Sequence, residues 1–234
     1  MLDEVELLTT IAIRVDGGGK TGHGHLYRML ALGDELQRQG AMVIYATATE
    51  AILRRLAIAA PTALRIRGSD EEWIERLGSD YDALVVDLPE PIADAPPGVI
   101  VLPRSHPWPG LPAPMDWDHV ILRREFAGRS RSFEPHGPPK VFVSAGGTDP
   151  AGLLPTLLAA TEAMQTPIST RVADGSIASM ADYLLGCDLA IVSYGMTALE
   201  CCACGVPPIC VCLTEGHSQG AWEIAVEDAG INLG

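Results

Sequence analysis

The sequence predicts an α/β protein with two parallel sheets, because short buried strands alternate with helical segments along most of the chain. Apolar runs such as IAIRV (11–15) and DALVVDLP (82–89) have the composition of buried strands, whereas LYRMLALGDELQRQG (26–40) repeats its apolar residues at helical spacing. Strands that alternate with helices of about 10–15 residues are typical of a parallel sheet covered on both faces. A Gly/Pro/Ser-rich segment, GRSRSFEPHGPPK (128–140), divides this pattern in two.

We therefore expect an N-terminal domain at residues 1–127, a linker at 128–139 and a C-terminal domain at 140–234. Two such domains would place a ligand cleft at the carboxyl ends of their sheets. Nine prolines crowd the stretch from Pro89 to Pro114, where regular structure is difficult to sustain. The expected strands are 11–15, 41–47, 63–68, 82–89, 99–102, 140–147, 167–173, 189–193 and 208–213, and the expected helices are 26–40, 49–60, 70–78, 149–164, 178–187, 196–205 and 218–230.

The composition is that of a globular chain with a strong negative charge. Hydrophobic residues make up 47% and charged residues 20%, which excludes a disordered chain, and no apolar run reaches the roughly 18–20 residues of a membrane helix. The acidic start MLDEVELLTT lacks the features of a secretory signal, so we expect a cytoplasmic protein without membrane insertion. A net charge of -14 argues against a nucleic-acid partner, although backbone N–H groups at a helix start still bind a small anion.

The six cysteines all lie between Cys187 and Cys212. The one C-x2-C pair, Cys201 and Cys204, has no second pair at the spacing of a zinc finger. Because free cysteine is commonly buried, we interpret the cluster as small apolar residues of a helix and a strand, with a metal site as the alternative.

The segment DGGGKTGHGHLYRML (16–30) joins a predicted strand to a predicted helix and is the first candidate site. The spacing of a P-loop fails, because Arg14 stands where its first glycine is needed. The stretch GGGKTG (17–22) matches the dinucleotide pattern G-x-G-x-x-G, but the acidic residue expected after the second strand, Glu50, comes late. We therefore expect no cofactor, and an NAD-dependent oxidoreductase remains an alternative.

Two histidines at the start of the predicted helix are the more specific feature of this loop. Histidine titrates near neutral pH, so His25 at the mouth of a cleft is a candidate for proton transfer, and the alternative is a side chain that caps or packs on its own helix. We expect His23 to be an exposed loop residue. The two residues are too few for a metal site, and the glycines beside them, Gly22 and Gly24, would let a ligand approach the backbone closely.

Five ordered blocks resemble the UDP-2,4-diacetamido-2,4,6-trideoxyhexose hydrolases of pseudaminic acid biosynthesis and their spore-coat-polysaccharide relatives. The first is IRVDGGGKTGHGHLYRMLALGDEL (13–36), which is similar to the N-terminal signature of that family. The others are VVD (85–87), LRREF (122–126), VSAGGTDP (143–150) and DLAIVSYGMTALECCACGVPPICVCL (188–213), the last being similar to the nucleotide-binding stretch of GT-B glycosyltransferases.

The resemblance implies a GT-B-like fold, with two Rossmann-like domains whose parallel sheets face each other across a cleft. It implies hydrolysis of a UDP-linked sugar to free sugar and UDP, in which His25 matches the family's catalytic histidine and deprotonates the attacking water. Asp16 would orient His25 or a sugar hydroxyl, or would cap the turn after its strand. Arg14, Gly22 and Gly24 lie in the same signature and are expected at the substrate, whereas Arg28 and Arg124 are expected to be structural or rim cations.

The second domain supplies the residues that the resemblance assigns to the nucleotide. Two loops would offer N–H groups to a diphosphate, and Glu200 would accept both ribose hydroxyls, with a solvated helix-surface glutamate as the alternative. Gln219 aligns with a family Asn-Gln pair, although Ser218 replaces the Asn. The residues expected in the two loops are Gly146, Gly147, Thr148, Ser193, Gly195 and Thr197.

The chain also departs from the family. The proline-rich stretch does not show the familiar loop of the first domain, and the second domain is short, so a homodimer would be one way to complete the site. A glycosyltransferase of the same architecture, in which His25 activates an acceptor hydroxyl, and a non-catalytic nucleotide-sugar binding protein therefore stay open as alternatives.

Overall fold

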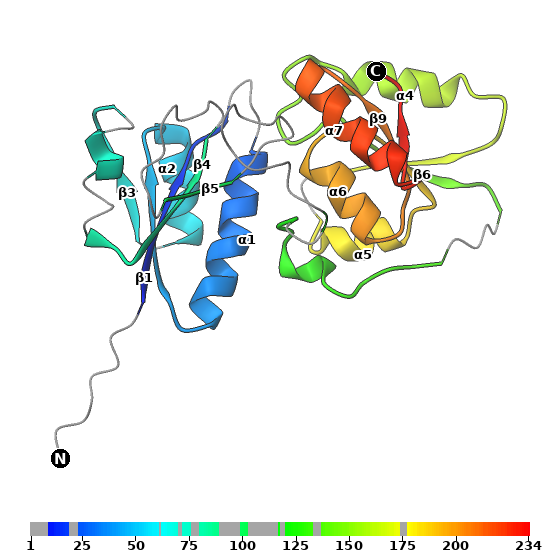
Figure 1. Cartoon of the computed structure of the whole chain (residues 1–234). Coiled ribbons are helices and arrows are strands. Elements are labelled where there is room, and N and C mark those ends of the chain that lie inside the picture. Colours follow the sequence, from blue (N-terminus) through cyan, green and yellow to red (C-terminus); the bar gives the residue numbers. More distant parts are fainter. Residues whose placement is uncertain are drawn as a thin grey trace. The chain divides into compact units, whose positions relative to one another are not determined.

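The computed structural model describes residues 9–18, 23–60, 62–69, 72–75, 80–88, 99–102, 117, 120–132, 137–173 and 177–234. The chain forms two compact units, Met1–Pro103 and Arg104–Gly234, and each has its own sheet (Figure 1). This division precedes the expected limit at residue 127, because Leu122 and Phe126 pack in the core of the second unit. The segment 120–127, expected in the first domain, therefore belongs to the second unit.

The first unit is a five-stranded parallel sheet with strand order β3-β2-β1-β4-β5. The order reverses between β1 and β4, so the carboxyl ends of these two strands border the crevice where α/β proteins bind ligands. Residues 72–75 are also helical, within the helix expected at 70–78. The elements are β1 (Thr10–Val15), α1 (Gly24–Arg38), β2 (Met42–Thr47), α2 (Glu50–Ala59), β3 (Ala63–Arg65), β4 (Ala83–Asp87) and β5 (Val99–Val101).

Helix α1 is held against β2 by a contact that requires a glycine. A Cβ atom on Gly33 would overlap the phenol ring of Tyr45, which is 1% exposed. The hydroxyl of Tyr45 donates a hydrogen bond to the carbonyl oxygen of Met29, 3.4 Å away. This close approach holds the middle of α1, from Met29 to Gly33, against the sheet.

The second unit is also a five-stranded parallel sheet, with strand order β10-β9-β8-β6-β7. Its order reverses between β6 and β8, which border the crevice of this unit. The strand β10 was not expected from the sequence. The elements are η3 (Arg124–Phe126), β6 (Lys140–Ser144), α4 (Leu154–Glu162), β7 (Ser169–Val172), α5 (Met180–Leu185), β8 (Leu189–Ser193), α6 (Met196–Ala203), β9 (Pro208–Val211), α7 (Glu215–Val226) and β10 (Ile231–Asn232).

Helix α4 begins later than the sequence predicts. Asp149 has a φ of 39°, and its carboxylate oxygens accept hydrogen bonds from the N–H groups of Leu153 (2.7 Å) and Leu154 (3.1 Å). Asp149 therefore caps the helix from outside, and the helix starts at Leu154 instead of at residue 149.

The cysteines lie in the core of the second unit. Cys187, Cys201, Cys204 and Cys210 are fully buried, and all six thiols are free. The prediction of small apolar residues is confirmed for these four. Among the described residues, no group of three His, Cys, Asp or Glu side chains is arranged to hold a metal ion.

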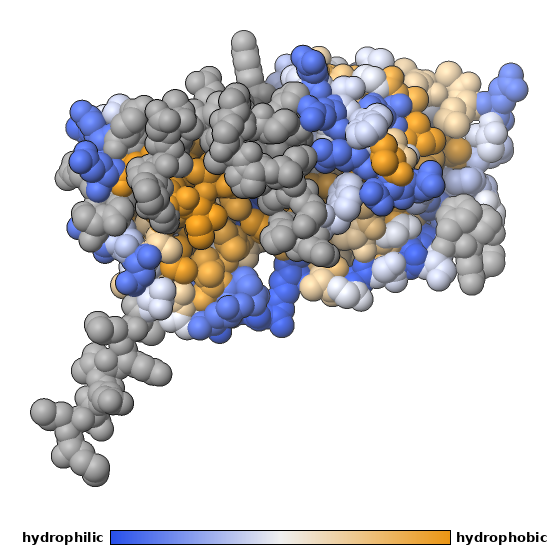
Figure 2. Space-filling model, in the orientation of Figure 1, coloured by the Kyte–Doolittle hydropathy of each residue, from blue (hydrophilic) through white to orange (hydrophobic). Residues whose placement is uncertain are grey.

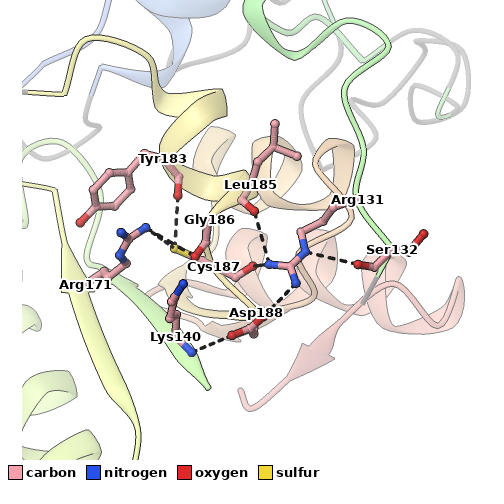
Figure 3. A network of polar contacts seen from close by, with 9 residues as sticks. All are labelled: Arg131, Ser132, Lys140, Arg171, Tyr183, Leu185, Gly186, Cys187 and Asp188. Atoms are coloured by element: carbon pink, nitrogen blue, oxygen red, sulfur yellow. Dashed lines mark hydrogen bonds and ion pairs between the residues drawn. The ribbon is translucent and has the colours of Figure 1, made fainter. Parts of the chain in front are cut away.

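The side chain of Arg131 anchors the segment 120–132 within the second unit (Figure 3). The guanidinium of Arg131 donates to the carbonyl oxygens of Leu185 (3.3 Å) and Cys187, and it pairs with Asp188 at 2.9 Å. Asp188 also accepts a hydrogen bond from the backbone N–H of Lys140, at 2.8 Å. Arg131 therefore binds the protein's own acceptors.

The surface is mixed in character. Large apolar side chains such as Ile58, Trp222 and Leu233 are exposed, and Figure 2 shows hydrophilic and hydrophobic residues on the visible face of both units. None of the helices in the described ranges combines the length and apolar composition needed to cross a membrane.

The contact at Gly33 predicts the effect of a single added methyl group. Gly33→Ala should destabilise the protein by about 1–3 kcal/mol, because overpacking against Tyr45 outweighs the better helix propensity of alanine. Urea denaturation followed by circular dichroism would measure this change. The matched control Gln37→Ala is at an exposed position one turn further along the same helix and should not lower stability, so an equal loss in both variants would contradict the packing argument.

Candidate functional site

Three charged or titratable side chains meet at the crevice of the first unit. Asp87 is the last residue of β4 and lies opposite Val15, the last residue of β1. His25 and Arg28 come from the first two turns of α1, three residues apart and so on the same side of the helix. The helix is the next element after β1, which pairs with β4, and both side chains reach the carboxyl end of β4.

Asp87 binds both partners at short distances. His25 Nδ1 lies 2.7 Å from Asp87 Oδ1, while Arg28 donates from Nε to Oδ2 (2.8 Å) and from Nη2 to Oδ1 (2.7 Å). The side chain of Asp87 is 1% exposed, and those of His25 and Arg28 are 19% and 14% exposed. The carboxylate is thus buried beneath a histidine that still reaches solvent.

The hydrogen bond to Asp87 assigns the tautomer of His25. An ionised carboxylate can only accept, so Nδ1 of the ring carries the proton that it donates to Oδ1. The other ring nitrogen, Nε2, then holds the lone pair and can accept a proton. The ring hydrogen-bonds to the end of β4 and does not cap its own helix.

The ionised state of Asp87 has a clear electrostatic cause. Burial alone would raise the pKa of Asp87, but the hydrogen bond from His25 and the charge of Arg28 outweigh burial and lower it. Asp87 therefore remains a carboxylate at neutral pH and does not compete with Nε2 of His25 for a proton.

Asp16 and Arg14 are placed differently from the prediction. The carboxylate of Asp16 pairs with Arg14 and accepts hydrogen bonds from the Thr47 hydroxyl and from the N–H of Thr49 at 3.2 Å. Arg14 is 2% exposed and also donates to the carbonyl oxygen of Val15. Asp87 therefore orients His25 in place of Asp16, and the burial of Arg14 argues against contact with a substrate.

The glycines and the second histidine of the loop are described in part. Gly22 lies outside the described residues, and Gly24 is the first residue of α1. His23 is half-buried, in contrast to the expected exposed side chain, and its Nε2 would lie 4.0 Å from a Cβ atom on Gly18. Burial and the charge of Arg55 lower the pKa of His23.

The crevice of the second unit is formed by loops after β6 and β8. Gly146 has a φ of 85°, which favours glycine, and a Cβ atom there would lie 3.5 Å from the hydroxyl of Ser193. The N–H of Gly146 donates to the hydroxyl of Ser144 at 3.2 Å. Gly147 and Thr148 follow in the first loop, and Gly195 and Thr197 lie at the start of α6. The structure thus brings both predicted loops to one edge of the sheet.

Glu200 lies one turn into α6 and is 6% exposed, so it is not a solvated surface residue. Arg123 donates to Glu200 Oε1 from Nε (3.2 Å) and from Nη2 (2.8 Å). Burial raises the pKa of Glu200, and the charge of Arg123 opposes that rise. The carboxylate is therefore held by one guanidinium at the crevice of the second unit.

Gln219 is half-buried in α7. In the described part of the chain, no hydrogen bond joins it to the other predicted residues. Helix α7 is instead positioned through Gly220, where a Cβ atom would overlap the ring of Tyr194 from the loop after β8.

Sequence reasoning assigned no role to Asp87 or Arg123. Both lie in segments that resemble the family, VVD (85–87) and LRREF (122–126). The signal for Asp87 was a single carboxylate at the end of a buried strand. Arg123 had no comparable signal, because its partner Glu200 lies 77 residues further along the chain.

Comparisons with known proteins show the fold. No family model matches the chain, and no curated protein does. Among solved structures, the chain is similar to the spinosyn rhamnosyltransferase SpnG complexed with thymidine diphosphate, with 17% identity and a TM-score of 0.57 over 97% of this chain and 86% of that one. The calicheamicin glycosyltransferase CalG4 matches with 14% identity and a TM-score of 0.57, over 97% and 85% of the two chains. SsfS6 from Streptomyces sp. SF2575 matches with 12% identity and a TM-score of 0.55, over 96% and 88%.

These similarities define the class of fold. The chain has the two-sheet α/β architecture of GT-B glycosyltransferases, as the sequence predicts. At such low identity the likeness shows the fold, and the function has to be argued from the site residues.

The pairing of Asp87 predicts a large loss of stability when its charge is removed. Asp87→Asn should destabilise the protein by about 3–5 kcal/mol, because Arg28 loses its buried counter-charge. Glu35→Gln, which breaks the exposed pair with Arg38, should cost about 1 kcal/mol or less and is the matched control. Similar losses in the two variants, measured by urea denaturation, would show that the buried pair has no special role.

The stability that Asp87 contributes should depend on pH in a definite direction. The folded-state pKa of Asp87 lies below its ordinary value of 3.8, so its stabilisation is complete above that value and is lost as the pH falls through the folded-state pKa. The difference in unfolding free energy between wild type and Asp87→Asn should therefore be constant at neutral pH and narrow in strong acid. If this difference in unfolding free energy already decreased between pH 7 and pH 5, the lowered pKa of Asp87 would be contradicted.

Proposed function

We propose that the protein is an enzyme acting on a sugar nucleotide, with His25 as its general base. The observation that carries this proposal is the hydrogen bond between His25 Nδ1 and the buried Asp87, which leaves Nε2 as the proton acceptor at the crevice of the first unit. A base that is fixed in one tautomer is what proton abstraction from water or a hydroxyl requires.

The second unit would bind the nucleotide diphosphate. The loop containing Gly146, Gly147 and Thr148 and the start of α6 offer backbone N–H groups, and the positive end of the helix dipole favours an anion. Glu200 would accept hydrogen bonds from the ribose hydroxyls. The similarity to SpnG, which was solved with thymidine diphosphate, supports a nucleotide diphosphate as ligand.

The reaction that we infer is hydrolysis with inversion. Nε2 of His25 takes a proton from water, the oxygen attacks the anomeric carbon, and the bond from that carbon to the diphosphate oxygen breaks. The electron pair leaves with the nucleotide diphosphate, so the products are the free sugar and, for a uridine nucleotide, UDP. The resemblance of the glycine and histidine loop to the UDP-sugar hydrolases supports water as the nucleophile.

A glycosyltransferase is the second candidate, in which His25 deprotonates an acceptor hydroxyl instead of water. It is supported by the fold likeness to glycosyltransferases, one of which was solved with its spinosyn aglycone. The two candidates share the base and the nucleotide site and differ only in the nucleophile. The substrates that would separate them are a diacetamido-trideoxyhexose linked to UDP and a rhamnose linked to TDP.

The proposed function predicts that the protein binds a pyrimidine nucleoside diphosphate. At about a hundredfold excess over the dissociation constant, UDP or TDP should stabilise the protein by about 2.7 kcal/mol, which raises the melting temperature by about 5–10 °C. Glu200→Gln should reduce this rise, whereas Glu162→Gln, an exposed glutamate of α4, should leave it unchanged. ADP serves as the nucleotide control, and a rise with NAD but with neither pyrimidine nucleotide would contradict the proposal.

The proposed function also predicts that turnover depends on His25. His25→Gln should lower kcat about 100-fold or more because the proposed base is removed, while nucleotide binding should persist because the proposed nucleotide site lies in the second unit. His23→Gln, the neighbouring histidine with no assigned role, is the matched control and should turn over like the wild type. Incorporation of ¹⁸O from labelled water into the released sugar would identify hydrolysis, and its absence when an acceptor is glycosylated would identify transfer. Full turnover in His25→Gln would exclude this residue as the base.

A further inference from the structure

Arg123 links two carboxylates of the second unit. Its Nε and Nη2 bind Glu200 Oε1, while Nη1 lies 2.7 Å from Glu125 Oε1. Glu125 in turn accepts hydrogen bonds at Oε2 from the Ser179 hydroxyl (3.0 Å) and from the N–H of Ala181 (3.3 Å), at the start of α5. One guanidinium therefore holds Glu200 in a fixed orientation relative to the beginning of a second helix.

The second oxygen of Glu200 is available to a ligand. Both hydrogen bonds from Arg123 end on Oε1, and Oε2 makes no hydrogen bond within the described part of the chain. In that same part, no buried side-chain oxygen or nitrogen is without a partner, so Oε2 must reach the surface. The carboxylate thus combines one occupied oxygen with one accessible oxygen.

From this geometry we propose that Arg123 is a positioning residue for nucleotide binding, holding Glu200 charged and oriented so that Oε2 accepts a ribose hydroxyl. This inference rests on the proposed function, because it assigns a partner to the carboxylate that would bind the ribose. Hydrogen bonds to a charged acceptor are stronger than those to a neutral one, so the charge of Glu200 matters for affinity.

Anchoring of the segment 120–132 does not explain the interaction of Arg123 with Glu200. That segment is held independently by Arg131, whose N–H donates to the carbonyl oxygen of Cys204 at 3.1 Å, and by the pair of Arg129 with Asp182. Arg123 also stacks on Phe126, with 5.2 Å from Cζ to the ring centroid, and that contact does not need Glu200. The two hydrogen bonds from Arg123 to Glu200 Oε1 therefore constrain the orientation of Glu200, the carboxylate that we assign to the ribose.

The charges around Glu200 indicate how its pKa should change when Arg123 is replaced. Burial raises the pKa of Glu200, Arg123 lowers it, and Glu125 raises it. The charge of Glu200 raises the pKa of the Cys201 and Cys204 thiols, and the charge of Arg129 lowers the pKa of Cys204. Because burial raises the pKa of both thiols, they are neutral near pH 7. Removing the charge of Arg123 should therefore raise the pKa of Glu200 further and move the loss of its charge toward neutral pH.

The test compares UDP with 2′,3′-dideoxyuridine diphosphate, so that titration of the phosphates cancels. Calorimetric affinities would be measured between about pH 5.5 and pH 8.5 for wild type, Arg123→Gln and Arg123→Lys. Wild type should prefer UDP by about 10-fold or more at neutral pH. In Arg123→Gln this preference should be smaller than in wild type and should be lost at a higher pH as the pH falls, whereas Arg123→Lys should retain much of the wild-type profile.

Two further variants make the result decisive. Arg129→Gln, which removes the exposed pair with Asp182, is the matched control and should show the wild-type pH profile. Glu125→Gln removes the neighbouring negative charge, keeps an oxygen to cap α5, and should extend the preference for UDP to lower pH. It also provides the test if Arg123→Gln does not fold.

The outcomes separate this inference from the proposed function. An unchanged pH profile in Arg123→Gln, or in Glu125→Gln where the first variant does not fold, would overturn the positioning role of Arg123. A wild-type protein that binds UDP and its dideoxy analogue equally at every pH would instead overturn the assignment of Glu200 to the ribose. Loss of all nucleotide binding in wild type would reject the proposed function itself.

Discussion

The buried charge of Asp87 is the constraint on which the candidate site of the first unit depends. A carboxylate at the end of a parallel strand is stable in its ionised form only if hydrogen-bond donors and a cation surround it. Helix α1 supplies both, because His25 and Arg28 are three residues apart and face the same strand end. Arg28 and His25 thus satisfy both carboxylate oxygens from one helix. The position of α1, which the contact of Gly33 with Tyr45 helps to set, is therefore also the position of the proposed base.

The second unit uses a related arrangement for a different purpose. In both units an arginine donates two hydrogen bonds to a carboxylate near the point where the strand order reverses. Arg28 binds both oxygens of Asp87, and the third contact of that carboxylate is the histidine. Arg123 binds one oxygen of Glu200 and leaves the other accessible. The first arrangement suits a carboxylate that orients another side chain, and the second suits a carboxylate that binds a ligand directly.

Much of the fold could be predicted from the sequence, because the alternation of buried strands and amphipathic helices is a local pattern. The strand 11–15 and the helix 26–40 lie within a few residues of β1 and α1. The start of α4 was misplaced because Asp149 and Pro150 resemble a helix start, whereas Asp149 caps Leu153 and Leu154 from further away. Strand β10 has only two residues and carries no periodic signal. Contacts between distant residues, such as that of His25 with Asp87, are set by strand order, which a local pattern does not contain.

The charge distribution also limits how a diphosphate leaving group would be stabilised. The arginines of the segment 120–132 whose partners are described are already paired: Arg123 with two glutamates, Arg129 with Asp182 and Arg131 with Asp188. Moving one of them to a phosphate would leave a carboxylate without its partner, which costs free energy where that carboxylate is buried, as Glu200 is. Backbone N–H groups at the loop after β6 and at the start of α6 carry no such cost, because their dipoles are fixed by the fold. In the proposed reaction, we therefore infer that backbone N–H groups, in place of these three arginine side chains, would stabilise most of the negative charge that develops on the departing diphosphate.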